Sequence, residues 1–464
     1  MHILFAASEC FPFVKIGGLA DVVGGLPKAL NKLGLEVSVV IPWYKQVSSI
    51  KNQVSSFKIK YDNKTEEVIV NRSTLPGTDI SVYLLENSHY LSQGGVYANQ
   101  ELHSQDEIER FIFFSQAVVE LARHLPGNAS RVDCIHCHDW HTSLIPLIAQ
   151  NNYKTVLTIH NLGRAYQGKT DLNTISKLNN LNEKDLRQTG DDINILLQGI
   201  EKADYLTTVS PTYASEIKTS QLGEGLDGYL RQKDNLFGIL NGIDTKIWNP
   251  WTDSKIPYCF TNNLQQDKNN NKQALLKELL LSSYEDGALI GMVTRVAEQK
   301  GFDILLPILE NVLVDRKNKI VILGVGDQQY ENNLTRLAAK FNNLKFLKKF
   351  DERLAHLIYA ASDLFLMPSH FEPCGIGQLV AMAYGTLPLV RKTGGLADSV
   401  RDLETGFVFE QYDSQSLAEK LKQALETYYQ QPKEFANMQV KAMAEDFSWE
   451  NSAKEYLKLY QKLI

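Results

Sequence analysis

The chain has 464 residues, of which 48 are lysine or arginine and 54 are aspartate or glutamate, so its formal net charge is −6. This balance argues against a nucleic-acid partner, because binding a phosphate backbone requires a concentrated positive field. The length predicts two domains, and the content of 44% hydrophobic and 22% charged residues is typical of a soluble globular protein.

The first ten residues, from Met1 to Cys10, lack the positive region and the long apolar run of a secretory signal. No apolar run approaches the roughly 20 residues that cross a membrane. The five cysteines are an odd and scattered set, which indicates reduced thiols. We therefore expect a cytoplasmic protein with no membrane contact.

The N-terminal half predicts a parallel sheet with helices. Residues 2–7 form an apolar run, a glycine-containing loop follows, and a helical pattern extends from Leu19 to a stop at Gly34, before a strand at 36–43. This βαβ unit places its loop at the carboxyl end of the first strand, where doubly wound sheets bind ligands. Further predicted elements are strands at 54–61, 66–71, 80–86 and 154–159 and a helix at 106–124.

The segment from Cys134 to His138 matches the CxxCH pattern for covalent haem attachment, and His141 nearby suggests zinc. A zinc site needs a second ligand pair at the appropriate spacing, and the sequence has none. We interpret the segment as a buried strand, 132–137, followed by a polar turn at 138–141.

The C-terminal half repeats the alternation of strands and helices. The predicted strands are 288–294, 319–324, 363–367 and 387–390, and the predicted helices are 302–314, 328–341, 352–361, 376–384 and 414–428. Two such blocks imply an α/β protein with two Rossmann-like, doubly wound domains.

A seven-residue segment occurs twice with one difference, as Lys15–Asp21 and as Lys392–Asp398. Each copy follows an apolar strand and opens a helical pattern. Paired glycines let backbone N–H groups approach an anion, and a helix N-terminus adds about half a positive charge. Two tight turns needed only for packing would give the same pattern, so both interpretations stay open at this point.

The residues most suited to chemistry lie in the second half. Arg295 and Lys300 share one loop after a strand and are able to grip both phosphates of a diphosphate. Glu372 follows a buried strand just before a helix, where a carboxylate can hold sugar hydroxyls while the helix end faces phosphate. Pro373 and Gly375 shape this turn.

The sequence shows neither a glycoside-hydrolase pair of carboxylates nor a strand followed by a DxD metal motif. We therefore expect no metal and no cofactor. Charge neutralisation of a phosphate would fall to Lys15, Arg295, Lys300 and the helix N-termini.

The ordered set of motifs resembles the bacterial glycogen synthase and plant starch synthase family. The matching segments run from the start of the chain to the final helix, 449–463, and comprise Lys15–Asp21, His138–His141, Thr158–Asn161, Thr207–Tyr213, Leu240–Asp244, Glu298–Gly301, Phe371–Gly375, Tyr384–Pro388 and Thr393–Asp398. Each motif is shared loosely with other glycosyltransferases, but the set in this order is specific.

The resemblance implies a GT-B fold with two Rossmann-like domains facing across a cleft. The expected domains are 1–242 on the acceptor side, 243–447 for the nucleotide sugar, and a C-terminal helix, 448–464, that returns to the first domain. It also implies retaining transfer of glucose to the non-reducing 4-hydroxyl of an α-1,4-glucan. The expected partners are that glucan and a nucleotide sugar, with ADP-glucose favoured over UDP-glucose.

Carried over by position, the resemblance also implies roles for individual residues. The catalytic residues would be Glu372, His160, Arg295 and Lys300. The acceptor side would include Asp21 and Asp139. The donor would be bound by Lys15, Gly17, Gly18, Asn241, Phe350, Cys374, Gly375, Ile376, Gly377, Thr393, Gly394 and Gly395.

Some positions depart from the family pattern. His370 stands where an arginine is common, Gln198 stands where many members have lysine, and the segment 161–193 is altered in length. Two other functions remain open on the sequence. One is a different GT-B glucosyltransferase, of the maltose-1-phosphate or sucrose type. The other is a catalytically weak paralogue that binds glucan.

Overall fold

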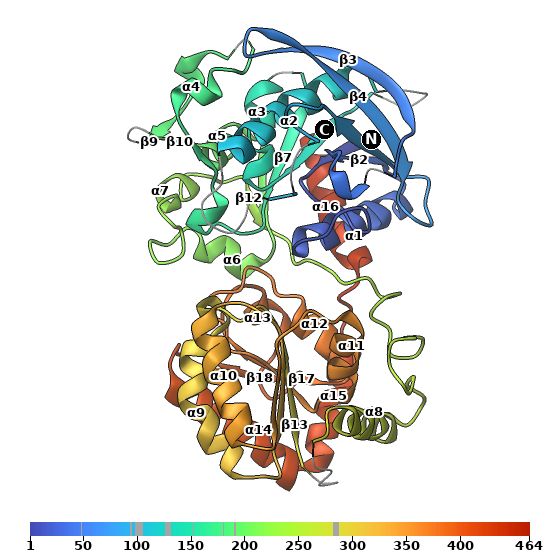
Figure 1. Ribbon diagram of the computed structural model, residues 1–464, viewed down its shortest axis with the longest axis vertical. Coiled ribbons are helices and arrows are strands. Elements are labelled where there is room, and N and C mark those ends of the chain that lie inside the picture. The colour runs from blue at the N-terminus through green and yellow to red at the C-terminus, as the bar shows by residue number, and fades with distance from the viewer. Residues whose placement is uncertain are drawn as a thin grey trace. The chain divides into compact units, whose positions relative to one another are not determined.

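The protein is described by a computed structural model that covers residues 1–47, 49–92, 95–97, 105–125, 131–150, 152–179, 181–189, 192–281 and 287–464. The chain divides into two compact units (Figure 1). The first unit contains Met1–Gly242 and Trp449–Ile464, and the second contains Ile243–Ser448. The boundaries expected from the sequence were 242 and 447.

The first unit is built on a sheet that has nine strands in the described part of the chain. Its strands pair in parallel except at one edge, where β4 is antiparallel to both β5 and β3. A smaller antiparallel sheet of β8, β10 and β9 lies in the same unit. In sheet order, the main strands are β12 (Leu236–Gly238), β11 (Tyr205–Thr208), β7 (Lys154–Ile159), β6 (Cys134–His138), β1 (His2–Ala6), β2 (Glu36–Pro42), β5 (Ser81–Glu86), β4 (Lys64–Thr74) and β3 (Gln53–Tyr61), and the short ones are β8 (Lys169–Thr170), β10 (Asp192–Asn194) and β9 (Gln188–Thr189).

Apolar periodicity explains the first βαβ unit. Every residue of β1 is buried, as expected for a parallel strand covered on both faces. Helix α1 (Gly18–Lys32) buries an apolar stripe that includes Val22, Val23 and Leu26. The other helices of this unit are α2 (Gln105–Arg123), α3 (Ile145–Ile148), α4 (Leu172–Ile175), α5 (Ile195–Lys202), α6 (Pro211–Glu216), α7 (Asp227–Leu230) and α16 (Trp449–Leu463).

The C-terminal helix α16 belongs to the first unit and lies beside α1 (Figure 1). Gly25 of α1 leaves no room for a side chain, because a Cβ there would overlap the indole of Trp449. Lys32 forms an ion pair with Glu450. The Ser452 hydroxyl donates to the carbonyl of Leu240 at 2.6 Å.

The second unit has a parallel sheet of six strands over the residues described there. In sheet order the strands are β15 (Leu344–Leu347), β14 (Lys319–Leu323), β13 (Leu289–Val293), β16 (Leu364–Met367), β17 (Leu387–Arg391) and β18 (Phe407–Phe409). Figure 1 shows α9 and α10 on one side of this sheet and α11 and α12 on the other. The helices are α8 (Leu264–Glu278), α9 (Phe302–Val314), α10 (Gln328–Lys340), α11 (Glu352–Ala361), α12 (Gly377–Ala383), α13 (Gly394–Ser399), α14 (Ser414–Gln430) and α15 (Pro432–Met443).

These elements confirm the predicted strands and helices, with ends shifted by at most three residues. The sequence patterns missed the short strands β8 to β12, β15 and β18 and the helices α3 to α8 and α15. Across the described residues no helix is both long enough and apolar enough to span a membrane.

Candidate active site

The predicted residues of the second unit follow the carboxyl ends of its parallel strands. Arg295 comes two residues after β13, Phe350 three after β15, Glu372 five after β16 and Thr393 two after β17. The carboxyl ends of parallel strands share one edge of the sheet, and ligands of doubly wound folds bind at that edge. The topology therefore gathers these residues at one end of this unit.

Glu372 and Lys300 form a mostly buried ion pair. The Lys300 ammonium lies 2.6 Å from Oε2 of Glu372, and the Ser369 hydroxyl donates to the same oxygen at 3.0 Å. The side chains are 18% and 8% exposed for Lys300 and Glu372. Lys300 ends the short helix η5 (Glu298–Lys300), which follows β13, so two neighbouring strands supply the two charges.

The glycine turn at the start of α13 packs against the backbone of the Glu372 loop. The amide of Gly395 donates to the carbonyls of Glu372 and Pro373, each at 3.2 Å. A Cβ at Gly394, whose φ is +44°, would overlap the carbonyl oxygen of Glu372. Close packing is thus one reason for the paired glycines in this copy of the repeated segment, and the Gly395 amide is engaged by the protein itself.

The segment predicted to hold the sugar continues from Glu372 into α12. The Cys374 side chain is buried and its thiol is free. Gly375 has φ +72°, and the buried Gln378 amide donates to the carbonyls of Cys374 and Gly375 at 3.1 Å each. Ile376 and Gly377 stand at the start of α12. A buried side-chain amide therefore fixes the backbone of this turn.

Arg295 and Phe350 differ from the Glu372 loop because they are exposed. The Arg295 guanidinium donates to Oε1 of Gln299 at 2.9 Å. Phe350 is 87% exposed, so its ring is accessible to a ligand. Nearby, the His370 ring stacks on Tyr412 with centroids 4.4 Å apart.

In the first unit, the loop between β1 and α1 is held by a carboxylate that sequence reasoning missed. Oε2 of the buried Glu9 accepts from the amides of Ile16 and Gly17, at 2.5 and 2.9 Å, and Oε1 accepts from the Tyr97 hydroxyl at 2.5 Å. The Gly17 N–H is therefore directed at a carboxylate of the protein itself. An acidic residue three positions after an apolar strand was the available signal.

Two charged residues of this loop lie beside one another. The Lys15 ammonium is 2.7 Å from Oδ1 of Asp21, and both side chains are partly exposed. Gly18 is the first residue of α1. The ammonium of Lys15 thus remains accessible at a helix N-terminus, where an anion is favoured.

The turn after β6 carries Asp139 in a strained conformation. Its φ is +53°, which is rare outside glycine and is typical of functional sites. Oδ1 accepts from the amide of His160 at 2.7 Å. Burial raises the pKa of Asp139 to about 7, although the backbone amides of His160 and Asn161 act to lower it. This carboxyl therefore titrates near neutral pH.

The segment 138–141, which was predicted to be a polar turn, is buried. His138, Trp140 and His141 are all buried. His138 lies within β6, and its Nδ1 is 2.9 Å from Nε2 of His160, which follows β7. Burial lowers the pKa of His160 to about 3. This polar segment is buried because its aromatic rings pack on one another, as Trp140 does on His141.

Asn241 lies buried after β12, and its Oδ1 has no hydrogen-bond partner among the residues that the structure describes. A buried acceptor without a partner is rare in a folded protein. Its position therefore suits a group that receives a hydrogen bond from a ligand hydroxyl.

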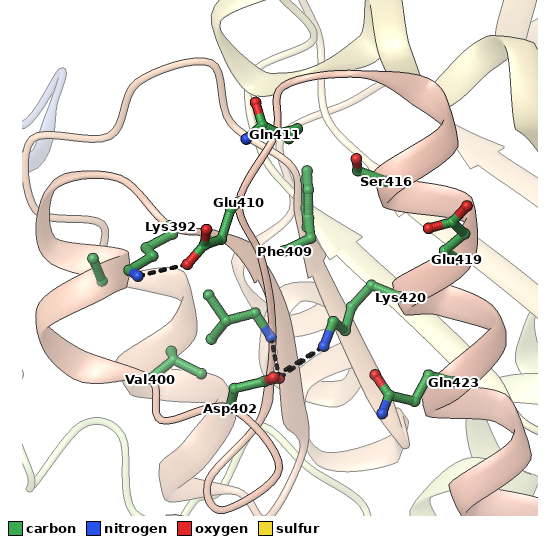
Figure 2. A pocket seen from close by; sticks show the side chains of 12 residues that line it. Lys392, Val400, Asp402, Phe409, Glu410, Gln411, Ser416, Glu419, Lys420 and Gln423 are labelled. Atoms are coloured by element: carbon green, nitrogen blue, oxygen red, sulfur yellow. Dashed lines mark hydrogen bonds and ion pairs between the residues drawn. The ribbon is translucent and has the colours of Figure 1, made fainter.

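The second unit also has a hollow of about 700 Å³ (Figure 2). Two ion pairs cross it, Lys392 with Glu410 at 2.6 Å and Lys420 with Asp402 at 3.0 Å. None of the predicted site residues lines it. This hollow is therefore not part of the predicted site.

The described part of the chain contains no cluster of three or more histidine, cysteine, aspartate or glutamate side chains suited to a metal ion. Cys134 and Cys137 are buried free thiols in β6. The CxxCH pattern is therefore part of a core strand.

Two family models match the chain. Residues 2–232 match the starch synthase catalytic domain, and residues 281–442 match glycosyl transferases group 1. The curated glycogen synthase of Thermotoga maritima is 39% identical over 493 residues, which covers 100% of this chain and 99% of that protein. The glycogen synthase of Bacillus cereus strain Q1 is also 39% identical, over 100% of both chains.

Solved structures give the same result. The catalytic domain of starch synthase IV from Arabidopsis thaliana, bound to ADP and acarbose, has a TM-score of 0.87 and 33% identity, and the match covers 99% of this chain and 98% of that one. Sucrose-phosphate synthase from Thermosynechococcus elongatus has a TM-score of 0.63 at 19% identity, which shows the shared GT-B fold alone. The chain is a GT-B glycosyltransferase that belongs to the glycogen synthase and starch synthase family.

Proposed function

We propose that this chain transfers glucose from ADP-glucose to the non-reducing 4-hydroxyl of an α-1,4-glucan, with retention at the anomeric carbon. The observation that carries the proposal is the Lys300–Glu372 ion pair at the carboxyl edge of the second sheet. The pair places a cation that can bind phosphate beside a carboxylate that can bind sugar hydroxyls, and both side chains are largely buried. The names of the relatives support the substrate class, and the ADP in the plant structure supports the donor base.

The reaction breaks the bond from the anomeric carbon to the diphosphate and forms a bond to the acceptor 4-oxygen. For retention, the acceptor attacks from the face that the diphosphate leaves, through an oxocarbenium-like state. The acceptor proton passes to the departing diphosphate. The main demand on the protein is therefore to stabilise negative charge on the leaving group, and no general acid is needed.

The charged and aromatic residues predicted on the donor side have distinct roles in this scheme. Lys300 and Arg295 neutralise the departing diphosphate, as does Lys15 at the start of α1. Glu372 accepts hydrogen bonds from sugar hydroxyls and holds the ring in position. The exposed Phe350 ring offers a stacking surface to the base.

In the first unit, His160 and Asn241 are proposed to contact the transferring glucose, and Asp139 and Asp21 to serve the acceptor side. Asp139 fixes the backbone of His160 through its Oδ1. The Oδ1 of Asn241, which lacks a partner among the described residues, would accept from a sugar hydroxyl.

The test is to incubate the protein with glycogen and either ADP-glucose or UDP-glucose, and to measure nucleotide release and chain extension. Extension with α-1,4 linkages, faster with ADP-glucose, is the expected result. Faster transfer from UDP-glucose would overturn the donor assignment. Nucleotide release without extension would point to a different acceptor, and no release from either donor would contradict the proposed function.

A further inference from the structure

Three histidine rings form a stack inside the first unit, and the proposed reaction uses only the last of them. His136 and His138 lie in β6, and His160 follows the neighbouring parallel strand β7. The ring centroids of His136 and His138 are 4.4 Å apart, and those of His138 and His160 are 5.2 Å apart. The rings therefore connect the core of the unit to the candidate site.

The innermost ring has a hydroxyl at each nitrogen. Nδ1 of His136 is 2.7 Å from the hydroxyl of Tyr460 in α16, and Nε2 is 2.6 Å from the hydroxyl of Thr158. A hydroxyl can donate or accept, so either tautomer of His136 is satisfied. This ring does not determine the protonation of the others.

The middle ring is different. Nδ1 of His138 faces Nε2 of His160 at 2.9 Å. Its own Nε2 is buried and has no hydrogen-bond partner among the described residues. Burial lowers the pKa of His138 well below its usual range and that of His160 to about 3, so both rings are neutral at pH 7. A neutral imidazole carries one proton, and the contact needs one donor and one acceptor.

Only two arrangements meet this condition. If His160 donates from Nε2, then Nδ1 of His138 is bare and the proton of His138 sits on Nε2, where it has no acceptor. If His138 donates from Nδ1, its Nε2 is bare and only a lone pair lacks a partner. Among buried backbone groups, N–H donors without a partner are rarer than under-satisfied acceptors, and we apply the same order to these ring nitrogens. The second arrangement is therefore favoured.

We propose that His138 is a positioning residue whose Nδ1–H donates to Nε2 of His160 and so holds His160 in the Nδ1–H tautomer. His160 then presents a donor, and not an acceptor, at its remaining ring nitrogen. This inference rests on the proposed function, in which His160 contacts the transferring glucose, and it assigns the contact as a donation to a sugar hydroxyl oxygen.

The backbone around the pair is fixed independently of the rings. The amide of His138 donates to the Thr142 hydroxyl at 2.7 Å, and this hydroxyl donates to the His138 carbonyl at 3.0 Å. The amide of His160 donates to Asp139. Hydrogen bonds of the main chain thus fix the positions of both residues. Replacing the His138 side chain should therefore change the tautomer of His160 more than its position.

The direct test is nitrogen NMR of the full chain labelled with ¹⁵N-histidine, in which protonated and bare ring nitrogens resonate far apart. A His160→Asn variant assigns the signals. We expect His160 with a protonated Nδ1 and a bare Nε2, and His138 likewise. A protonated Nε2 on His160, or a mixture of both forms in equal amounts, overturns the inference.

Variants link the tautomer to turnover. His138→Phe keeps a ring of similar shape and removes the donor, and we expect kcat/KM to fall about tenfold, the scale of one neutral hydrogen bond. His138→Asn retains an amide donor near the place of Nδ1 and should keep the His160 spectrum and most of the activity. Tyr460→Phe is the matched control, because it removes a histidine hydrogen bond one ring further in and should leave the tautomer unchanged.

The two proposals fail in different ways. If the native protein transfers no glucose but the NMR shows the Nδ1–H form, the proposed function is wrong and the tautomer assignment stands. If it transfers glucose and the NMR shows the Nε2–H form, only this inference fails. If His138→Phe does not fold, the native spectrum and His138→Asn still decide.

Discussion

Replacing Lys300 with methionine removes the cation from the Lys300–Glu372 pair while keeping a side chain of similar length. The Glu372 carboxylate, 8% exposed, would keep the Ser369 hydroxyl at 3.0 Å and lose its charge partner at 2.6 Å. The variant therefore tests whether this pair serves catalysis or only the fold.

The expected loss has two separable parts. Leaving one member of a buried ion pair without its partner costs about 3–5 kcal/mol of folding free energy, and the 18% exposure of Lys300 favours the lower end. Loss of one contact to developing negative charge costs about 2.7–4 kcal/mol in the transition state. At about 1.36 kcal/mol per tenfold, kcat should fall by roughly 100- to 1,000-fold.

The same unit contains a matched control. Lys272 of α8 lies 2.7 Å from Oδ2 of Asp363, with side chains that are 5% and 12% exposed, and neither residue belongs to the predicted site. Lys272→Met should therefore lower stability by at least as much. In a unit of about 200 residues, a loss of about 3 kcal/mol lowers the thermal midpoint by roughly 6–12 °C.

The assay measures kcat with saturating donor and glycogen at a temperature where each variant is folded, and thermal midpoints by calorimetry. Lys300→Met should lose both turnover and stability, whereas Lys272→Met should lose stability alone. Near-native kcat in Lys300→Met would refute the assignment of Lys300. An equal loss of kcat in both variants would show that the effect arises from folding.

Three further outcomes are expected. Gly394→Ala adds a Cβ against the loop carbonyl behind the candidate carboxylate at a φ of +44°, and steady-state kinetics should show kcat at least about tenfold lower in a folded protein. Gly25→Ala should lower the thermal midpoint by the equivalent of about 1–3 kcal/mol, because its Cβ overlaps Trp449, whereas Gly228→Ala, with 3.9 Å to the nearest atom, should not. The pKa of Asp139 is raised from 3.8 to about 7, so between these pH values the folded protein holds a proton that the unfolded chain has released. The stability that this group contributes therefore falls as pH rises from about 4 to 7. Asp139→Asn should remove this dependence of the melting temperature on pH.

Much of the fold follows from local pattern. The buried run of β1, the apolar stripe of α1 and the glycine after it specify the first βαβ unit without reference to the rest of the chain. The same patterns place Glu372 and Arg295 after parallel strands, and strand topology then gathers them at one edge.

Helix α8 could not be predicted in this way. Its sequence contains three consecutive asparagines and has no clear apolar stripe. It is held by buried lysines: the Lys268 ammonium donates to the carbonyls of Ala360 and Tyr384 and to the Thr386 hydroxyl, at 2.8 to 3.1 Å. Burial lowers the pKa of Lys268 to about 7. Hydrogen-bond partners about 100 residues away in the sequence stabilise this helix, and a local sequence pattern cannot identify them.

The candidate site shows the same limit. Residue type and position were enough to select Glu372 and Lys300, but not to show that they form an ion pair with each other. Glu9 and His138 were missed because a carboxylate and an imidazole ordinarily favour water. Their burial is explained by specific partners, the amides of a loop for Glu9 and the ring of His160 for His138.

The first unit is assembled from both ends of the chain, with about 200 residues of the second unit between them. During synthesis, α1 and β6 leave the ribosome long before Trp449 and Tyr460, which cover them, have been made. At about 5–20 residues per second, synthesis of the roughly 200 residues of the second unit alone takes about 10–40 s. For that time the nascent unit exposes the apolar face that α16 later covers, so a chaperone that holds this surface would raise the yield of native protein.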